Sequence, residues 1–457
     1  MIGRRVKQMS SRILIPAAFA VAVTLACQDG PTATERAPVS PRPSLAVRDG
    51  LPFSEELAEL GDQIFDDTNL SLRKNQACRS CHLAEWGFTG PNPAINAAGA
   101  VYPGSVPTRF GDRKPPSSAY STLSPVLRYV RQAGDHFVGG SFWDGRATGE
   151  RLGNAAADQA QGPFLNPMEQ ALPDAACVVH RVSIAPYAPD YVELWGNDIQ
   201  TIAFPGETDA LCGIEGTTVP LSPADRAKVR VEYANIAIAI AVYEESHNLF
   251  SSKFDATRRG LYTFTPEEQR GFALFQGKGQ CARCHVSAGQ QPAFTDHTYD
   301  NLGVPANPQN PFYATNPGFV DFGLGGFLQT RPEWAALAPA EIGKMRVPTL
   351  RNVDLRPYVS ATKAYMHNGV FKSLEEVVRF YNTRDVLPQC APGAPRAAWG
   401  QTCWPAAEVQ QNVNRIELGN LGLSLEEEAA IIAFLRTLSD GFMVPSGRGR
   451  MAGPMQP

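Results

Sequence analysis

The chain has 457 residues, enough for two domains of ordinary size, and 43% of them are hydrophobic. This content is sufficient for globular cores and excludes a fibrous or disordered protein. Only 19% of the residues are charged and the formal net charge is -4, so no basic surface is expected and we exclude nucleic acid as a partner.

The first 27 residues are typical of an export signal. Basic residues precede an apolar run over residues 13–26, which is too short to cross the ~30 Å hydrocarbon layer of a bilayer comfortably. The run ends at Cys27, and the ending Thr-Leu-Ala-Cys resembles the lipobox of bacterial lipoproteins. We therefore predict a periplasmic protein that is lipid-anchored through Cys27 to a bacterial membrane and has no other membrane contact; plain signal cleavage is the alternative.

Residues 28–50 are rich in Pro, Ala and Thr with little to bury, which predicts a flexible linker. After the linker, capping residues mark several helices. Ser54 opens a helix through Leu60 and Phe65, and Thr265 with Pro266 and Glu268 opens one through Phe275. Two more are expected over residues 235–250 and from Ser424 to near Leu438.

Two Cys-x-x-Cys-His motifs are the strongest signal in the chain: Cys78, Cys81 and His82 form the first, and Cys281, Cys284 and His285 form the second. Two cysteines at this spacing can bond the two vinyl groups of one haem, and the adjacent His then reaches the iron. A zinc site would need a second cysteine pair nearby, and neither motif has one. We therefore predict two covalently bound haem c groups, with His82 and His285 as iron ligands.

Strand signals are scarce, so we expect a mainly α fold. It should consist of two cytochrome c-like haem domains, over residues 51–255 and 256–445, with long Gly/Pro-rich loops packed on the haems. Cys177, Cys212, Cys390 and Cys403 remain outside the haem motifs and the signal. An even remainder in an exported protein suggests disulfides, and proximity favours Cys177–Cys212 and Cys390–Cys403 over four unpaired thiols.

Several segments resemble the bacterial di-haem cytochrome c peroxidase family, which includes the MauG-like enzymes. They are LGDQIFDDTNLS before the first haem motif, SFWDGRATG at 141–149, QAQGPFLNPMEQ at 159–170, VPTLRNVDLRPY, and KAYMHNGVFKSLEEVVRFYNTRD. The resemblance covers residues 55–440. It implies peroxide chemistry at the N-terminal haem and electron transfer through the second.

The sixth position of the first haem should be open. In the peroxidase members of the family, a His in the loop after the first motif occupies this position at rest, but residues 83–135 contain no His. We therefore expect a five-coordinate first haem, as in the MauG-like branch. His136 is the next candidate, and we interpret it as a structural or supporting residue.

The resemblance also assigns the residues around the first haem. Cleavage of the peroxide O–O bond needs a positioned acid/base. Glu169 matches the family's catalytic Glu, and Gln159 matches the Gln that orients it. Trp143 matches the FWDGR tryptophan beside the haems, where it would relay electrons or serve only in packing. About six residues are inserted between Trp143 and Gln159, so the loop over this site should differ from the family's.

For the second haem, the resemblance places the distal ligand fourteen residues after His367, at Tyr381. A capping box of Ser373 and Glu376 predicts a helix over residues 374–382 that turns Tyr381 inward. Met366 and Met345 are the alternative ligands. A phenolate ligand stabilises oxidised iron, so this haem is suited to sharing oxidising equivalents, as in the MauG-like branch.

The family also has a calcium site, which is matched only in part here. Thr362 matches one position, but Lys114 stands where the family has an Asn ligand, and a charged lysine cannot bind calcium. Calcium therefore stays an open alternative to a metal-free region.

We thus expect a di-haem c-type oxidoreductase that reduces hydrogen peroxide at the first haem. The electrons should come through the second haem from a donor protein, such as a small cytochrome or cupredoxin, or from a protein substrate. The rival interpretation is a non-catalytic electron-transfer cytochrome. The open sixth position argues against it, because an electron carrier gains from two six-coordinate haems.

Overall fold

The computed structural model describes residues 46–48, 51–132 and 134–445. The predicted export signal, Cys27 and most of the predicted linker lie outside these residues. Within the described ranges, no helix is both long enough and apolar enough to cross a bilayer.

The described part is mainly helical, as predicted. Its helices are α1 Glu55–Phe65, α2 Pro93–Ala97, α3 Ala155–Ala160, α4 Gly162–Leu165, α5 Ala175–Ser183, α6 Ala188–Trp195, α7 Thr208–Leu211, α8 Pro223–Glu245, α9 Lys253–Arg258, α10 Pro266–Gln276, α11 Pro311–Thr315, α12 Gly323–Leu328, α13 Ala338–Glu341, α14 Leu374–Thr383 and α15 Leu425–Arg436. The strands form three antiparallel pairs: β1 Ala46–Arg48 with β2 Leu51–Phe53, β3 Arg128–Val130 with β4 His136–Val138, and β5 Tyr299–Asp300 with β6 Met345–Arg346.

The capping residues act as predicted. Ser54, Thr265 and Ser424 each accept a hydrogen bond from the first turn of α1, α10 and α15, and the last two helices have complete capping boxes. The helix expected over residues 235–250 has the wrong bounds, because α8 begins at Pro223 and ends at Glu245. The first turns of α8 are polar, so the apolar pattern did not predict them. Ser222 caps the start of the helix by accepting a hydrogen bond from the Asp225 N–H.

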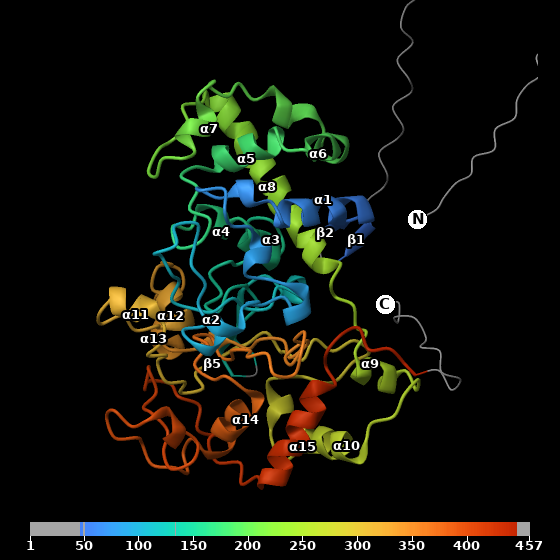
Figure 1. Cartoon of the computed structure of the whole chain (residues 1–457), viewed down its shortest axis with the longest axis vertical. Helices are drawn as coiled ribbons and strands as arrows, with labels where there is room; N and C mark the ends of the chain where they lie inside the picture. The colour runs from blue at the N-terminus through green and yellow to red at the C-terminus, as the bar shows by residue number, and fades with distance from the viewer. Residues whose placement is uncertain (1–45, 49–50, 133, 446–457) are drawn as a thin grey trace, which may run out of the picture. The chain divides into compact units, whose positions relative to one another are not determined.

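Two helix pairs repeat the same packing in the two halves of the chain (Figure 1). Helix α1 crosses α8, and α10 crosses α15. Each crossing has a glycine at the closest approach: a Cβ on Gly61 would overlap the carbonyl oxygen of Ala239, and one on Gly271 would overlap that of Ala430. Only glycine allows the helix axes to come this close at either place.

The hydrophobic interior is divided in the same way. One cluster runs from Leu51 to Tyr243 and surrounds α1, α5 and α8, and the other runs from Phe254 to Leu438 and surrounds α10, α14 and α15. The predicted boundary at residue 255 falls inside α9, whose Phe254 packs in the second cluster. The chain therefore passes from one cluster to the other between Tyr243 and Phe254.

Replacing Gly61 or Gly271 with Ala should lower the free energy of unfolding by about 1–3 kcal/mol, because the added methyl group forces the crossing helices apart. Denaturant titration measures this loss. Gly206 is the control, since a Cβ added there would meet no atom within 4 Å. Equal stability of the Gly61→Ala variant and the wild type would contradict close packing at this crossing.

Both predicted disulfides are confirmed. Cys177 bonds Cys212 within the first half, and Cys390 bonds Cys403 within the second. The four remaining cysteines of the described part are unpaired, and they are the cysteines of the two Cys-x-x-Cys-His motifs. The fold therefore keeps these four thiols free for another partner.

Candidate functional site

The two motif histidines are held in the same way. The His82 Nδ1 lies 3.0 Å from the carbonyl oxygen of Phe88, and the His285 Nδ1 lies 2.9 Å from that of Phe294. A carbonyl oxygen can only accept, so Nδ1 carries the proton and donates it. Nε2 of each ring then presents a lone pair, the form in which histidine binds iron.

The chain around each histidine also repeats. Phe88 and Phe294 both have a positive φ, 57° and 54°. Each is followed by a threonine whose Oγ1 donates to a carbonyl: Thr89 to Pro115 at 2.6 Å and Thr295 to Val347 at 2.7 Å. The two motifs are thus built on one local plan, and the structure gives both the same donor set of two thiols and one imidazole.

The four motif cysteines are half-buried. Burial raises the pKa of Cys81, Cys281 and Cys284 to about 12. Burial also raises the pKa of Cys78, and the nearby carboxylates of Glu244 and Glu169 raise it further. The free thiols are therefore neutral, and two neutral thiols beside an imidazole fit the attachment of haem c.

A mostly apolar cavity lies next to the second motif. Its walls include Cys281, Cys284 and His285 of the motif, and Tyr381 of α14. Leu374 and Val377, from the same helix, also line it, so α14 presents the predicted face. The cavity has the lining that a large planar apolar cofactor needs.

The cavity does not show which side chain is the distal ligand of the second haem. Met345 and Met366, the two alternatives to Tyr381, also line it. Of the capping box predicted for α14, Ser373 caps the helix, whereas Glu376 accepts from the Lys372 backbone N–H at 2.5 Å instead of from Ser373. Tyr381 therefore stays a prediction with a suitable position.

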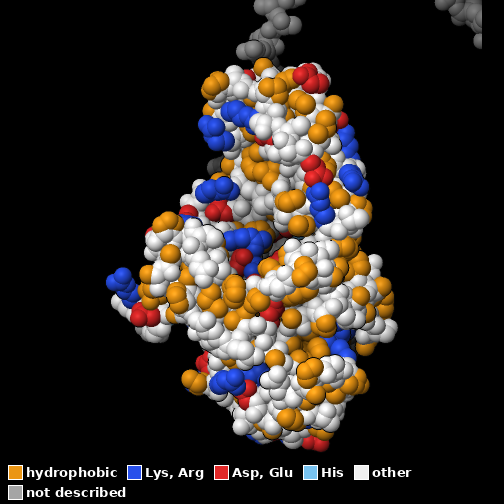
Figure 2. Space-filling model, turned by 90° about the vertical axis from the view of Figure 1, so that its left-hand side faces the viewer, with side chains coloured by type: hydrophobic (Ala, Val, Ile, Leu, Met, Phe, Trp, Pro, Cys, Tyr) orange, Lys and Arg blue, Asp and Glu red, His pale blue; other side chains and the backbone are white. Residues whose placement is uncertain are grey.

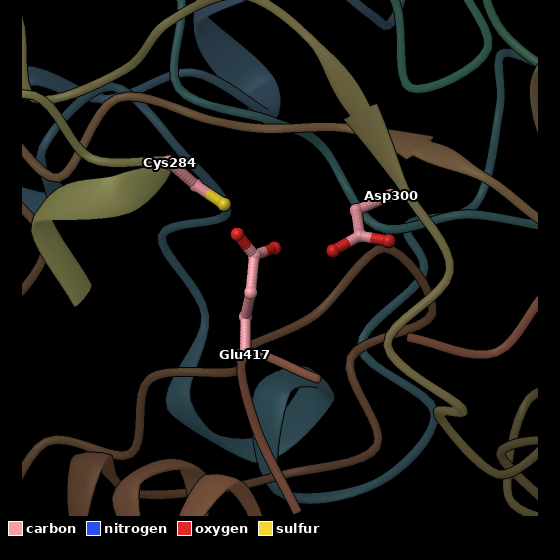
Figure 3. Close-up of side chains that lie close together, drawn as sticks. All are labelled: Cys284, Asp300 and Glu417. Carbon is pink, nitrogen blue, oxygen red and sulfur yellow. The ribbon is translucent and has the colours of Figure 1, made fainter. Parts of the chain in front are cut away.

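Two carboxylates stand beside Cys284 (Figure 3). Ligand atoms of Cys284, Asp300 and Glu417 lie within 4.8 Å of one another. The amide of Asn414 donates to both carboxylates, at 2.6 and 2.8 Å, and burial raises the pKa of Asp300. Because Cys284 belongs to the second haem motif, we assign no metal ion here, and this group gives that site an acidic edge.

Glu169 lies beside the first motif. Its carboxylate raises the pKa of both Cys78 and Cys81, and its Oε1 accepts a hydrogen bond from the Asn166 amide at 2.8 Å. Burial raises the pKa of Glu169, while the charge of Arg146 and the Asn166 bond oppose this rise. The side chain is thus a half-buried carboxyl with a raised pKa, which takes part in proton transfer at a higher pH than an exposed Glu does.

The predicted partner of Glu169 is not joined to it. Gln159 is half-buried on α3 and makes no hydrogen bond to the Glu169 carboxylate, which is bonded to Asn166. Asn166 was not among the predicted site residues, although it stands three positions before Glu169 in the same turn. His136 lies on β4 and is half-buried.

Trp143 connects the two halves. Its indole Nε1–H donates to the carbonyl of Lys114 at 3.1 Å, and its own carbonyl accepts from the Arg346 N–H at 2.8 Å. Lys114 directly precedes Pro115, whose carbonyl accepts from Thr89, and Arg346 directly precedes Val347, whose carbonyl accepts from Thr295. Lys114 and Arg346 therefore occupy equivalent positions at the two motifs. Trp143 also lines the cavity of the second site and touches the His367 ring edge at 6.5 Å between ring centres.

A buried ion network fixes the tryptophan loop. Arg113 pairs with Asp144 at 2.7 Å and with Asp321, which its Nε and Nη2 bond at 2.7 Å each. Asp144 follows Trp143 directly, and Arg146 pairs with it from outside. The sequence showed these residues only as charged positions near FWDGR, because their partners are distant along the chain.

The residues at the family's calcium position do not fit calcium. The Lys114 ammonium group donates to Thr89 Oγ1 and to the Pro115 carbonyl, oxygens that a metal ion would need. The carbonyl of Thr362 accepts from Asn96 at 3.1 Å. Calcium needs six or more free oxygen ligands. The oxygens of Thr89, Pro115 and Thr362 already accept hydrogen bonds from N–H donors.

Two cytochrome c-like helix pairs, each with a Cys-x-x-Cys-His motif whose histidine is poised to bind iron, define a two-haem c-type protein. Residues 55–263 match the family model described as di-haem cytochrome c peroxidase. Over 405 residues the chain is 34% identical to the methylamine utilization protein MauG of Paracoccus denitrificans, covering 85% of this chain and 90% of that protein. The chain therefore belongs to the di-haem cytochrome c peroxidase and MauG family.

Two other relatives also match this chain over most of their length. The cytochrome c551 peroxidase of Nitrosomonas europaea is 25% identical over 391 residues, which cover 85% of this chain and 81% of that protein. The di-haem peroxidase BthA of Burkholderia thailandensis superposes with a TM-score of 0.66 at 26% identity, covering 89% of this chain and 91% of that one. Family membership implies two c-type haems with iron and peroxide-related redox chemistry.

Proposed function

We propose that this protein is a peroxide-dependent oxidoreductase in which the haem on Cys78, Cys81 and His82 is five-coordinate and reacts with hydrogen peroxide. The observation that carries the proposal is the Glu169 carboxyl beside the first motif, half-buried and held by Asn166. The absence of any His from residues 83–135 supports an open sixth position. The haem supplies the site at which peroxide is bound and reduced.

The residues of the chain have separate tasks in this reaction. The Phe88 carbonyl accepts a hydrogen bond from His82 Nδ1, which keeps Nε2 directed at the iron position. The Glu169 carboxylate accepts a proton from one peroxide oxygen and returns it to the departing one. Asn166 orients that carboxylate through its 2.8 Å hydrogen bond. We keep Gln159 as a further orienting residue that needs a side-chain movement to reach Glu169.

Cys281, Cys284, His285 and Tyr381 would hold the second haem, which would share the oxidising equivalents with the first. Trp143 supports this route, because its hydrogen bonds join the equivalent segments of the two haem sites. Electrons come from a small cytochrome or cupredoxin, or from side chains of a protein substrate. The face drawn in Figure 2 mixes acidic, basic and apolar side chains without a large patch of one sign, so charge on that face does not select a partner.

We further propose the cellular setting and the domain division. The protein is exported to the periplasm by residues 1–27, lipid-anchored through Cys27, and tethered by residues 28–50. Residues 51–255 carry the peroxide-reactive haem and residues 256–445 the electron-transfer haem, with long Gly/Pro-rich loops packed on both. The two disulfides support export, because such bonds persist in oxidising compartments.

Stopped-flow mixing with peroxide tests the function. The fully oxidised holoprotein should react without prior reduction, at a rate proportional to peroxide concentration. A reduced small cytochrome is then added in a second mix. Decay of the oxidised product only with this donor indicates peroxidase turnover, and a product that persists beside the donor indicates a MauG-type oxidant for a protein substrate. No spectral change with peroxide in either mix would contradict the proposal.

A further inference from the structure

Two lysine side chains are buried near the first haem motif and bonded only to uncharged oxygens. The Lys114 Nζ donates to Thr89 Oγ1 at 3.2 Å and to the Pro115 carbonyl at 2.9 Å. The Lys363 Nζ donates to the carbonyls of Asn352 and Leu355, both at 2.9 Å. Neither ammonium group forms an ion pair with any carboxylate of the described residues. Burial without a counter-ion disfavours the charged form of both groups: it lowers the pKa of Lys114 to about 8 and the pKa of Lys363 well below its ordinary value.

Both ammonium groups adjoin the loop that orients His82. Lys114 bonds Thr89, and a Cβ on Gly87 would lie 3.0 Å from the Lys363 Nζ. Between Gly87 and Thr89 stands Phe88, whose carbonyl holds the His82 ring. The two amino groups therefore adjoin the two ends of the segment, Gly87 to Thr89, that positions the first iron ligand.

The same groups also face the second site. Lys114 and Lys363 line the cavity that holds Cys281, Cys284 and His285. The Lys114 Nζ lies 5.8 Å from the centre of the Trp143 ring. The two amino groups thus lie between the sites proposed for the two haems.

We propose that the amino groups of Lys114 and Lys363 occupy this inter-haem region in place of a calcium ion and leave the region calcium-free. Each amino group donates to oxygen atoms that could otherwise bind a metal ion, and a positive charge on either amino group would repel a dication. Because the amino groups are covalently part of the chain, chelation cannot remove them from the region. This inference rests on the two-haem part of the proposed function.

Chelation of the wild-type holoprotein is the first test. After dialysis against EDTA, the ferric absorption spectrum and both haem reduction potentials should equal those of the untreated protein. Calorimetric titration with calcium chloride should give no heat of binding. Loss of the native spectrum with EDTA and its return with calcium would overturn the inference. None of these readouts involves peroxide, so this result is independent of the test of the proposed function.

Charge removal is the second test. Lys114→Met and Lys363→Met keep the apolar stem and remove the amino group. Lys114→Met should lower the reduction potential of a haem, because a nearby positive charge favours the reduced state. Lys363→Met should lower it less, because burial depresses the pKa of Lys363 further than that of Lys114. Lys114→Arg should restore the wild-type potentials. Lys372→Met is the matched control: its ammonium group donates to the carbonyls of Asn96, Ala98 and Gly369, and burial lowers its pKa to about 8, as it does for Lys114. Wild-type potentials in both Met variants would show that the lysines only support the fold.

Discussion

Replacing Glu169 with Gln lowers the rate constant for the reaction with hydrogen peroxide by about 10²- to 10⁴-fold, the usual effect of losing a positioned acid/base. Gln keeps the shape of the side chain and its contact with Asn166 but cannot take a proton. Stopped-flow absorbance at the first haem measures the rate. Glu150→Gln is the control, since Glu150 is exposed and paired with Arg331. A Glu169→Gln variant that reacts at the wild-type rate would remove Glu169 from the mechanism.

The pH dependence of the same rate follows from the pKa of Glu169. Burial raises this pKa above the ordinary value of a glutamate, so the carboxyl stays protonated to a higher pH than a free Glu does. The carboxylate is the form that accepts the peroxide proton, and the rate should therefore fall as the pH drops through the raised pKa. The Glu169→Gln variant should lose this acidic limb of the profile. The limb would persist in the variant if another group were the base.

Replacing Tyr381 with Phe changes the second haem and leaves the first one intact. Loss of the phenolate ligand should remove the low-spin ferric signal of the second haem and raise its reduction potential on the order of 0.1 V, since axial ligands set haem potentials over a wide range. Ferric electron paramagnetic resonance and a spectroelectrochemical titration measure the two changes.

Three further variants separate Tyr381 from its rivals. Tyr365→Phe is the matched control, because Tyr365 lines the same cavity and its hydroxyl has no hydrogen-bond partner among the described residues. Met345→Leu and Met366→Leu test the alternative ligands. If the second-haem spectrum survives in Tyr381→Phe and changes in one Met variant, that methionine is the ligand and the MauG-like interpretation of this haem fails.

The sequence predicted the helices that local residues determine. Ser54, Thr265, Ser373 and Ser424 are short-range signals, since a cap and its partner stand within one turn, and each of them caps a helix. The start of α8 was missed because its first turns are polar and an apolar pattern does not detect them. The close crossings at Gly61 and Gly271 depend on the facing helix, which no local pattern gives.

The candidate site was predictable to a similar degree. The cysteine and histidine motifs are local, and the disulfide pairs follow from proximity in the chain. By contrast, the Phe88 and Phe294 carbonyls that orient the histidines are backbone groups, which side-chain patterns do not reveal. The pairing of Arg113 with Asp321, 208 positions away, and the burial of Lys363 also required the folded chain.

Spectroscopy of the fully oxidised holoprotein tests the central claim most directly. The account predicts one high-spin, five-coordinate haem and one low-spin haem per chain, and loss of the high-spin signal on addition of one equivalent of hydrogen peroxide without any reductant. Two low-spin haems that do not change with peroxide would contradict it and would identify an electron-transfer cytochrome.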